Sequence, residues 1–251
     1  MISVVLNTYN AEKYLEPVLE SVKDFDEIVV CDMESTDNTV AIAERIGCKI
    51  VTFPKGNITI CEPARNTAIQ SASNEWVLVI DADEIVTPEL REHLYKLAAD
   101  PNSADAYFIA RLNGVLDGYD LSSYPDYQCR FLKKSKTDWP ATIHAKPVID
   151  GRVDYLPKDR KELAFRHYPE PMSKRFMKIC TYTDNEVPRR KGKKVTMLSL
   201  VTEPFFRFFK SYILKGGIMH GKIGYIRAQE ACFYRFMLLC KLYEEQLKEG
   251  K

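Results

Sequence analysis

The chain has 251 residues, of which 45% are hydrophobic and 28% charged, and a formal net charge of +1, which is the composition of an ordinary globular protein. It contains no apolar stretch of 18 residues that could span a membrane. Its seven cysteines form no C-x-x-C pair, which indicates a reducing compartment and argues against disulfides and a zinc site. Because no signal peptide is recognisable, we expect a cytoplasmic protein.

Charge is distributed unevenly along the chain. Residues 1–150 carry 14 Lys and Arg against 24 Asp and Glu, whereas residues 151–251 carry 22 against 11. This asymmetry indicates different partners, with cations for the acidic part and an anionic surface or substrate for the basic part. A basic part that only keeps the protein soluble fits the charges equally well. Nothing in the pattern is typical of nucleic-acid binding.

The first hundred residues alternate between strand and helix patterns. Apolar residues at helical spacing separate four short apolar runs that predict strands, at 2–6, 27–31, 48–53 and 76–80. Ser35 and Thr36 suit the N-cap of the second helix. The alternation predicts an α/β, Rossmann-like fold with a mixed, mainly parallel sheet and helices on both of its faces.

The rest of the chain changes character. Short strands separated by turns are predicted between residues 104 and 170, and helical patterns follow. The sequence therefore predicts three parts: an α/β half at 1–103, a second part of the same domain at 104–170, and a basic helical C-terminal extension at 171–251.

Polar clusters follow three of the predicted strands, at 7–10, 32–37 and 81–84. Ligands bind at the carboxyl ends of parallel strands, so these clusters are expected to converge on one crevice. The third cluster, Asp81-Ala82-Asp83-Glu84, holds three carboxylates that repel one another unless a cation neutralises them. A hard divalent cation such as Mg²⁺ is the functional interpretation, and a solvated turn is the alternative.

Two charged residues stand near these clusters in the sequence. Arg65 is suited to contacting a phosphate bidentately or to pairing with one of the acids, with a surface arginine as the alternative. Asp32, at the end of the second strand, is suited to accepting hydrogen bonds from a base or ribose, with a helix-capping acid as the alternative.

Four blocks of the sequence, in their order and spacing, resemble the family-2 glycosyltransferases, which have the GT-A fold. They are Val4–Asn10, Val29–Thr39, Ala64–Asn66 and Trp76–Glu84. The segment from Pro204 to about Tyr225 resembles the C-terminal part of the branch that includes the bacterial lipopolysaccharide-core glucosyltransferases.

This resemblance implies an inverting, metal-dependent enzyme that moves a sugar from a nucleotide-sugar, most plainly a UDP-sugar, to a hydroxyl of a glycan or lipid-linked acceptor. The product would belong to lipopolysaccharide or another cell-surface glycan. Residues 1–103 would bind the donor, and residues 104–170 would form the acceptor side. Asp83, with Asp81, would coordinate Mg²⁺ or Mn²⁺, which neutralises the departing nucleoside diphosphate. His167 is a candidate for completing the metal shell.

The resemblance also implies how the donor is held. Asn7 and Tyr9 would line the nucleobase pocket, with Asp32 hydrogen-bonding the base. Arg65 would lie near the diphosphate or base, and Asp81 near the ribose and metal.

The catalytic base is less clearly marked. In the branch that this chain resembles, a His-Glu pair follows the arginine-bearing segment, whereas here the sequence reads His144-Ala145. Candidates for the base are Asp126 and His144, and further candidates are Asp117 and Asp120. For each of them a loop acid or a structural histidine is the simpler interpretation.

Two other classes of protein were weighed against the glycosyltransferase. A sugar nucleotidyltransferase would need a glycine-rich loop after the first strand, and residues 7–11 contain no glycine. A nucleotide-sugar-binding relative or scaffold that has lost catalysis is consistent with Ala145 in place of the glutamate, so this alternative stays open.

Aromatic residues and cations alternate over residues 204–215. One interpretation is a helix that lies on the anionic inner face of the cytoplasmic membrane, where a lipid-linked acceptor is found. The other is a helix that packs its aromatic residues against the domain. The basic run 189–194 is suited to the phosphates of an acceptor or to a solvated loop.

Overall fold

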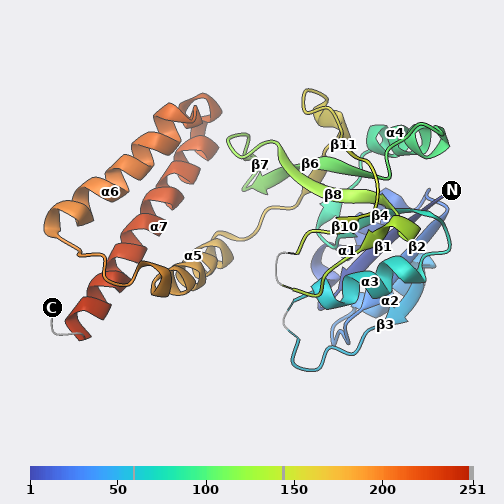
Figure 1. Cartoon of the computed structure of the whole chain (residues 1–251), viewed down its shortest axis with the longest axis horizontal. Coiled ribbons are helices and arrows are strands. Elements are labelled where there is room, and N and C mark those ends of the chain that lie inside the picture. The colour runs from blue at the N-terminus through green and yellow to red at the C-terminus, as the bar shows by residue number, and fades with distance from the viewer. Residues whose placement is uncertain (59, 143–144, 249–251) are drawn as a thin grey trace. The chain divides into compact units, whose positions relative to one another are not determined.

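The structure is a computed structural model that describes residues 1–58, 60–142 and 145–248 (Figure 1). The chain divides into two compact units. Unit 1 comprises Met1–Leu112 and Pro125–Tyr168, and unit 2 comprises Asn113–Tyr124 and Pro169–Lys251. The division therefore places a short internal segment, as well as the C-terminal part of the chain, in unit 2.

The first half of unit 1 is a parallel α/β arrangement. Its strands lie in the order β3-β2-β1-β4 (Figure 1); their bounds are Ile2–Thr8 for β1, Glu27–Asp32 for β2, Lys49–Thr52 for β3 and Trp76–Asp81 for β4. The helices between and after them are α1 (Glu12–Val22), α2 (Thr39–Ile46), α3 (Glu62–Ser71) and α4 (Pro88–Ala99).

The remaining strands of unit 1 extend this sheet. β8 (Asp126–Lys133) pairs antiparallel with both β4 and β6 (Ala106–Val115), and β5 (Glu84–Ile85) pairs antiparallel with β12 (Phe165–His167). β11 (Val153–Tyr155) pairs parallel with β6, whereas β9 (Thr137–Asp138) and β10 (Val148–Ile149) form a separate antiparallel pair. The short helices of this unit are η1 (Lys134–Lys136) and η2 (Lys161–Leu163). β7 (Gly118–Tyr119), which pairs with the end of β6, belongs to unit 2. The predicted mixed sheet is confirmed, with parallel pairing in its first half.

Two apolar layers cover the two faces of this sheet. Alternate residues of a strand point to opposite faces, so Val4 and Leu6 of β1 pack in one layer, with apolar residues of α1, α2 and α4. Val5 packs in the other layer, with apolar residues of α3. The prediction of helices on both faces is therefore confirmed.

The prediction that Ser35 or Thr36 caps the second helix is wrong. α2 begins at Thr39, with Asn38 at the N-cap position, and the Asp37 carboxylate accepts a hydrogen bond from the Thr39 N–H at 3.0 Å. The Ser35 hydroxyl instead donates to Asp32 at 2.6 Å. The polar residues after β2 thus fix the end of the strand, while a residue further along starts the helix.

Unit 2 is mainly helical, as predicted for the C-terminal extension. Its elements are α5 (Met172–Glu186), η3 (Pro188–Arg190), α6 (Met197–Phe209), the π-helical turn η4 (Lys210–Leu214), η5 (Gly217–His220) and α7 (Gly221–Lys248). α6 lies alongside α7 (Figure 1). A Cβ atom at Gly224 would stand 1.8 Å from the Gly217 carbonyl oxygen, so this contact between α7 and η5 requires glycine.

The apolar core of unit 2 is small. It consists of Val195 and three leucines of α7, Leu238, Leu239 and Leu242. Many other large apolar side chains of this unit are exposed, most of all on α6. Among the described residues, no helix combines the length and the apolar composition needed to cross a membrane.

Candidate active site

The polar clusters at the carboxyl ends of β1, β2 and β4 lie next to one another. In the sheet register Thr8 is opposite Asp32, and Asn7 is opposite Asp81. Because the three strands are parallel neighbours, their last residues meet at one edge of the sheet. The structure therefore brings together the segments that the sequence predicted to converge.

Two buried arginines hold the Asp81 carboxylate. Arg65, from α3, donates to one oxygen at 2.7 Å, and Arg130, from β8, donates to the other at 2.5 Å. Burial would raise the pKa of Asp81, but the charges of Arg130 and Arg65 outweigh it and hold that pKa far below its usual range. Asp81 is therefore ionised, with both oxygens engaged.

Glu84 extends this network into the interior of unit 1. Its side chain is fully buried; one oxygen accepts the Asp81 backbone N–H at 3.0 Å, and the other accepts Arg111 at 3.1 Å. Arg111, from β6, also donates to Asp126 at 2.8 Å. Burial lowers the pKa of Arg111, whereas Glu84 and Asp126 raise it, and the net result is a raised pKa.

The charges of this network balance. Three arginines face three carboxylates: Arg65, Arg111 and Arg130 with Asp81, Glu84 and Asp126. Asp83 stands outside these ion pairs and lies instead against the ring nitrogen Nε2 of His167, at 3.3 Å. The pairing of β12 with β5 places His167 opposite Glu84 and so beside Asp83.

Several nitrogen atoms of the network lack a hydrogen-bond partner in the described part of the chain. They are Nη1 of Arg65 and both Nε and Nη1 of Arg130, all of them buried. Both amide atoms of Asn7 and the indole Nε1 of Trp139 share this property. Unsatisfied buried donors are rare in native structures and call for an explanation; an anionic ligand that approaches after a small side-chain shift would satisfy the arginine atoms.

Asp32 and Tyr9 have their own contacts. Asp32 is buried and accepts hydrogen bonds from the Thr8 hydroxyl at 2.8 Å and from the Ser35 N–H at 2.8 Å, so it also fixes the end of β2. Tyr9 is about half exposed, and the Lys55 ammonium lies 4.6 Å from the centre of its ring.

The candidates for the catalytic base are not all in one place. Asp126 is in the arginine network, while Asp117 and Asp120 belong to unit 2. His144 lies outside the described residues. Of the predicted site residues, the structure therefore joins Asp81 with Arg65 and Asp83 with His167 directly, and Asp126 is linked to Asp81 through Arg111.

Sequence reasoning missed three contributors. Arg111 and Arg130 were given no role, and Trp139, whose ring lies 4.8 Å from the Arg65 guanidinium carbon, was not considered. The sequence offered one signal, because Arg130 interrupts the apolar run of Cys129, Phe131 and Leu132. A cation at a core position needs a buried carboxylate partner.

The side chains near Asp83 are suited to a cation whose remaining coordination positions are filled by a bound ligand, and not to a metal site built from protein groups alone. Within residues 1–58, 60–142 and 145–248, no group of three or more His, Cys, Asp or Glu side chains could hold a metal ion. Asp83 and His167 provide two donors 3.3 Å apart. Mg²⁺ needs only one or two protein carboxylates when substrate phosphates supply further oxygens, so these residues fit such an ion.

The fold and the sheet-edge site define a GT-A protein. The family model for glycosyl transferase family 2 matches residues 3–146. An uncharacterized glycosyltransferase of Rickettsia conorii is 30% identical over 263 residues, which cover 98% of this chain and 91% of that protein. The chain therefore belongs to glycosyltransferase family 2.

A further relative agrees with this assignment, and two solved structures share the fold. The lipopolysaccharide core biosynthesis glycosyltransferase LpsC of Rhizobium meliloti is 27% identical over 263 residues, covering 100% of this chain and 94% of LpsC. Among solved structures, the mannosyltransferase PcManGT of Pyrobaculum calidifontis, in complex with GDP-Man and Mn²⁺, gives a TM-score of 0.54 at 15% identity and covers 98% of this chain and 87% of that one. TarS 1–349 of S. aureus gives 0.50 at 17%, covering 100% and 92%.

Replacement of the buried glutamate tests the network. Glu84→Gln should lower the free energy of unfolding by about 1–3 kcal/mol, because Arg111 and Arg130 lose part of their compensating charge in a buried setting. Urea unfolding followed by tryptophan fluorescence reports unit 1 specifically, since Trp76 and Trp139 are the two tryptophans of the chain.

Glu92→Gln is the matched control, since Glu92 is exposed on α4; its change should stay within about 0.5 kcal/mol. Equal stability of Glu84→Gln and wild type would show that the network does not hold unit 1 together.

Proposed function

We propose that this glycosyltransferase transfers a sugar with inversion from a nucleotide-sugar to a hydroxyl of a glycan or lipid-linked acceptor, in the synthesis of lipopolysaccharide or another cell-surface glycan. The observation that carries the proposal is the charge pattern at the strand ends. Unsatisfied N–H groups of Arg65 and Arg130 adjoin a carboxylate, Asp81, and a second carboxylate, Asp83, stands outside the arginine pairs. A nucleoside diphosphate with a divalent cation complements this combination.

A bound Mg²⁺ or Mn²⁺ would neutralise the negative charge of the departing nucleoside diphosphate. Asp83 and His167 are the residues that would hold it. Asp81 is a weaker ligand as the network stands, because both of its oxygens accept arginine hydrogen bonds; it would join the metal only if one of those bonds opened. The GDP-Man and Mn²⁺ in PcManGT support a metal-dependent donor site.

The remaining residues of the donor site have distinct roles in this proposal. Asn7, whose amide atoms are buried and unsatisfied, would hydrogen-bond the nucleobase, and the half-exposed ring of Tyr9 would stack on it. Asp32 contributes by fixing the strand end and by offering its remaining acceptor capacity to the base. Arg65 would contact the diphosphate through Nη1 while it keeps its ion pair to Asp81.

Turnover of nucleotide-sugars tests the function as a whole. Incubation with Mn²⁺ and a panel of UDP-sugars, with GDP-mannose included, should release nucleoside diphosphate from one of them, and membrane glycan extracts should accelerate the release. Binding of UDP without turnover of any donor, with or without extract, would favour a non-catalytic relative, which Ala145 in place of a glutamate would then explain.

Removal of the Asp83 carboxylate tests the metal site. Asp83→Ala should abolish the Mn²⁺-stimulated part of UDP binding in calorimetry, because His167 alone is a poor site for a hard cation. The circular dichroism spectrum should not change, since the Asp83 side chain is 40% exposed.

Asp159→Ala removes an exposed carboxylate of the same unit and should leave the affinity within about twofold. An Asp83→Ala protein that binds UDP and Mn²⁺ as wild type does would eliminate the metal role.

The base is assigned to Asp126 or His144, of which the structure describes Asp126. Arg111 and Gln128 fix the Asp126 carboxylate with hydrogen bonds of 2.8 and 3.0 Å, which orients it for proton transfer. Asp126→Asn should lower kcat by about 10²- to 10⁴-fold and change the UDP affinity little. A kcat within about threefold of wild type would transfer the role to His144.

We also propose that the protein works in the cytoplasm, with unit 2 on the inner face of the membrane. The outward side of α6 carries large exposed apolar residues: Met197, Leu198, Val201, Phe205, Phe206 and Phe209. Lys210 and Lys215 follow in η4 and just after it, and both are exposed. An apolar face flanked by cations is suited to anionic lipid.

Vesicle flotation tests this contact. Changing Phe205, Phe206 and Phe209 to Ser should reduce binding to vesicles of phosphatidylglycerol and phosphatidylcholine by at least about tenfold, because three aromatic side chains no longer enter the interface. The control changes exposed apolar residues of α5 and α7, at Met177, Phe236 and Tyr243, to Ser. Equal flotation of the two triple variants would remove α6 from the proposal.

A further inference from the structure

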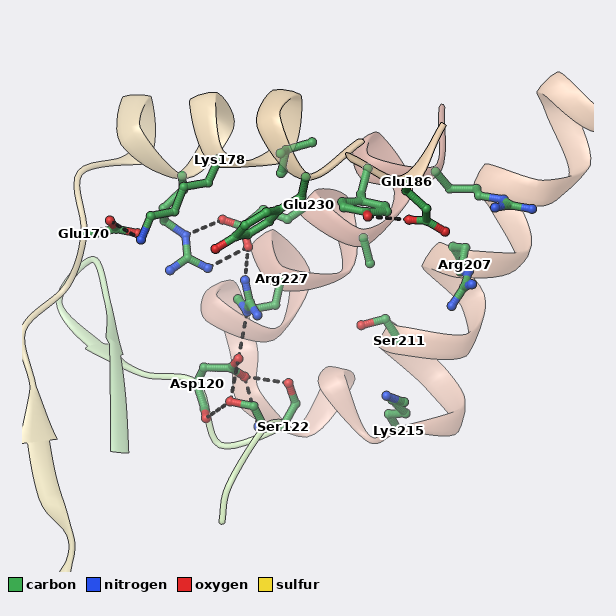
Figure 2. Close-up of a pocket in the computed structure, with 17 residues that line it drawn as sticks. Asp120, Ser122, Glu170, Lys178, Glu186, Arg207, Ser211, Lys215, Arg227 and Glu230 are labelled. Atoms are coloured by element: carbon green, nitrogen blue, oxygen red, sulfur yellow. Dashed lines mark hydrogen bonds and ion pairs between the residues drawn. The ribbon is translucent and has the colours of Figure 1, made fainter. Parts of the chain in front are cut away.

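Unit 2 contains a cavity of about 590 Å³, which is separate from the residues assigned to the donor site. All of its lining residues belong to unit 2, and they come from α5, α6, η4, α7 and the internal segment that contains Asp120. Figure 2 shows two unlike walls. On one side a chain of ion pairs joins three elements, and on the other Arg207, Ser211 and Lys215 follow one another without a dashed contact.

The carboxylates of the first wall are already neutralised. Arg227 donates to Asp120 at 2.7 Å and is also paired with Glu230, while Arg175 donates to both oxygens of Glu230 at 2.7 and 2.8 Å. Ser122 adds a hydroxyl at 2.5 Å from Asp120. Burial raises the pKa of Asp120, but Ser122 and Arg227 outweigh it and keep the pKa below its usual value. These acids therefore stay ionised and engaged.

The other acids that line the cavity are engaged as well. Glu170 pairs with Lys178 at 2.6 Å, and Glu186 pairs with Arg190 and accepts the Tyr234 hydroxyl at 2.5 Å. No carboxylate of the lining is left for an added cation. A metal ion is therefore a poor candidate for the occupant.

Cations are in excess in this lining. Six cationic side chains face four carboxylates; the cations are Arg175, Lys178, Arg207, Lys215, Arg227 and Arg235. Arg235 forms an ion pair with Glu203, a residue that does not line the cavity. Arg207 and Lys215 have no ion pair with any residue that the structure describes, so two positive charges are left beside the Ser211 hydroxyl.

We propose that this cavity binds the phosphate group of a phosphorylated ligand, with Arg207 and Lys215 supplying the charge and Ser211 a hydroxyl. A phosphate monoester carries nearly two negative charges at neutral pH, which matches the two uncompensated cations. Arginine binds phosphate through a planar fork of N–H donors, and lysine binds it as a point charge. The ion pairs of the opposite wall hold α5, α7 and the Asp120 segment in place around the ligand.

The size of the cavity indicates that the ligand is larger than phosphate itself. Sites for small organic molecules measure about 300–1,000 Å³, so a phosphorylated sugar or a lipid phosphate headgroup fits the space. We infer that the ligand is the phosphate-bearing part of the acceptor. This identification of the ligand rests on the proposed function. The binding of phosphate itself does not depend on that function.

Calorimetry with inorganic phosphate on the full-length protein tests the site. EDTA in the buffer keeps the donor site free of metal, so that phosphate does not report on it. The double variant Arg207→Gln and Lys215→Gln should lose affinity by at least about tenfold, since two charged donors are removed. Both side chains are exposed, so circular dichroism should show a folded protein.

Lys174→Gln with Lys222→Gln is the control, because it likewise removes two positive charges, from side chains that are exposed in unit 2 and do not line this cavity. Its affinity should stay within about twofold of wild type. Equal affinity of wild type and both double variants, or no heat of binding in the wild type at 10 mM phosphate, would overturn the proposal.

Two further probes separate the sources of the phosphate. Glucose 6-phosphate and dioctanoyl phosphatidic acid are titrated in the same way, and the tighter of the two identifies a sugar phosphate or a lipid headgroup as the better ligand. UDP binding with Mn²⁺ should be unchanged in the Arg207 and Lys215 variant. A protein that binds phosphate but turns over no nucleotide-sugar would keep this site while it removes the proposed function.

Discussion

The Asp81 carboxylate, held between Arg65 and Arg130, is the contact on which unit 1 depends most. It joins the last residue of a parallel strand to a helix that precedes it and to an antiparallel strand that follows 49 residues later. Buried ion pairs contribute little net stability, because desolvation offsets their attraction, but loss of one partner is costly. The contact therefore acts through position, because it favours the arrangement of β4, α3 and β8 that pairs these charges.

The sequence predicts the parallel half of unit 1 well, because its signals are local. Apolar runs, helical spacing and polar residues at strand ends lie within a few positions of one another, and they are enough to place Asp81 near Arg65. The roles of Arg111 and Arg130 could not be read in the same way. Both reach the site through antiparallel pairing of β6 and β8 with distant segments, and no local pattern specifies that register. His167 reaches Asp83 by the same kind of pairing.

Asp32 shows a different limit of sequence reading. Its position after β2 fits both a ligand role and a capping role, and the structure shows that Thr8 and Ser35 already take several of its acceptor sites. The helix-capping alternative is therefore wrong, because α2 begins at Thr39 with Asn38 at its N-cap position. Asp32 instead fixes the end of β2 and the residues that follow it. Residue type and spacing cannot separate these roles, because the same carboxylate can accept hydrogen bonds from a loop or from a ligand.

The uneven distribution of charge in the sequence has a local explanation in each unit. Around the end of β4 the acidic excess of residues 1–150 does not appear, because three arginines neutralise three acids and Asp83 lies against His167. In unit 2 a small apolar core is supplemented by chains of ion pairs that consume most of the charged side chains. What matters for ligands is the remainder after pairing. At the two sites that remainder is Asp83, beside His167, and the two cations of the cavity in unit 2. The two sites therefore offer a ligand opposite signs of charge.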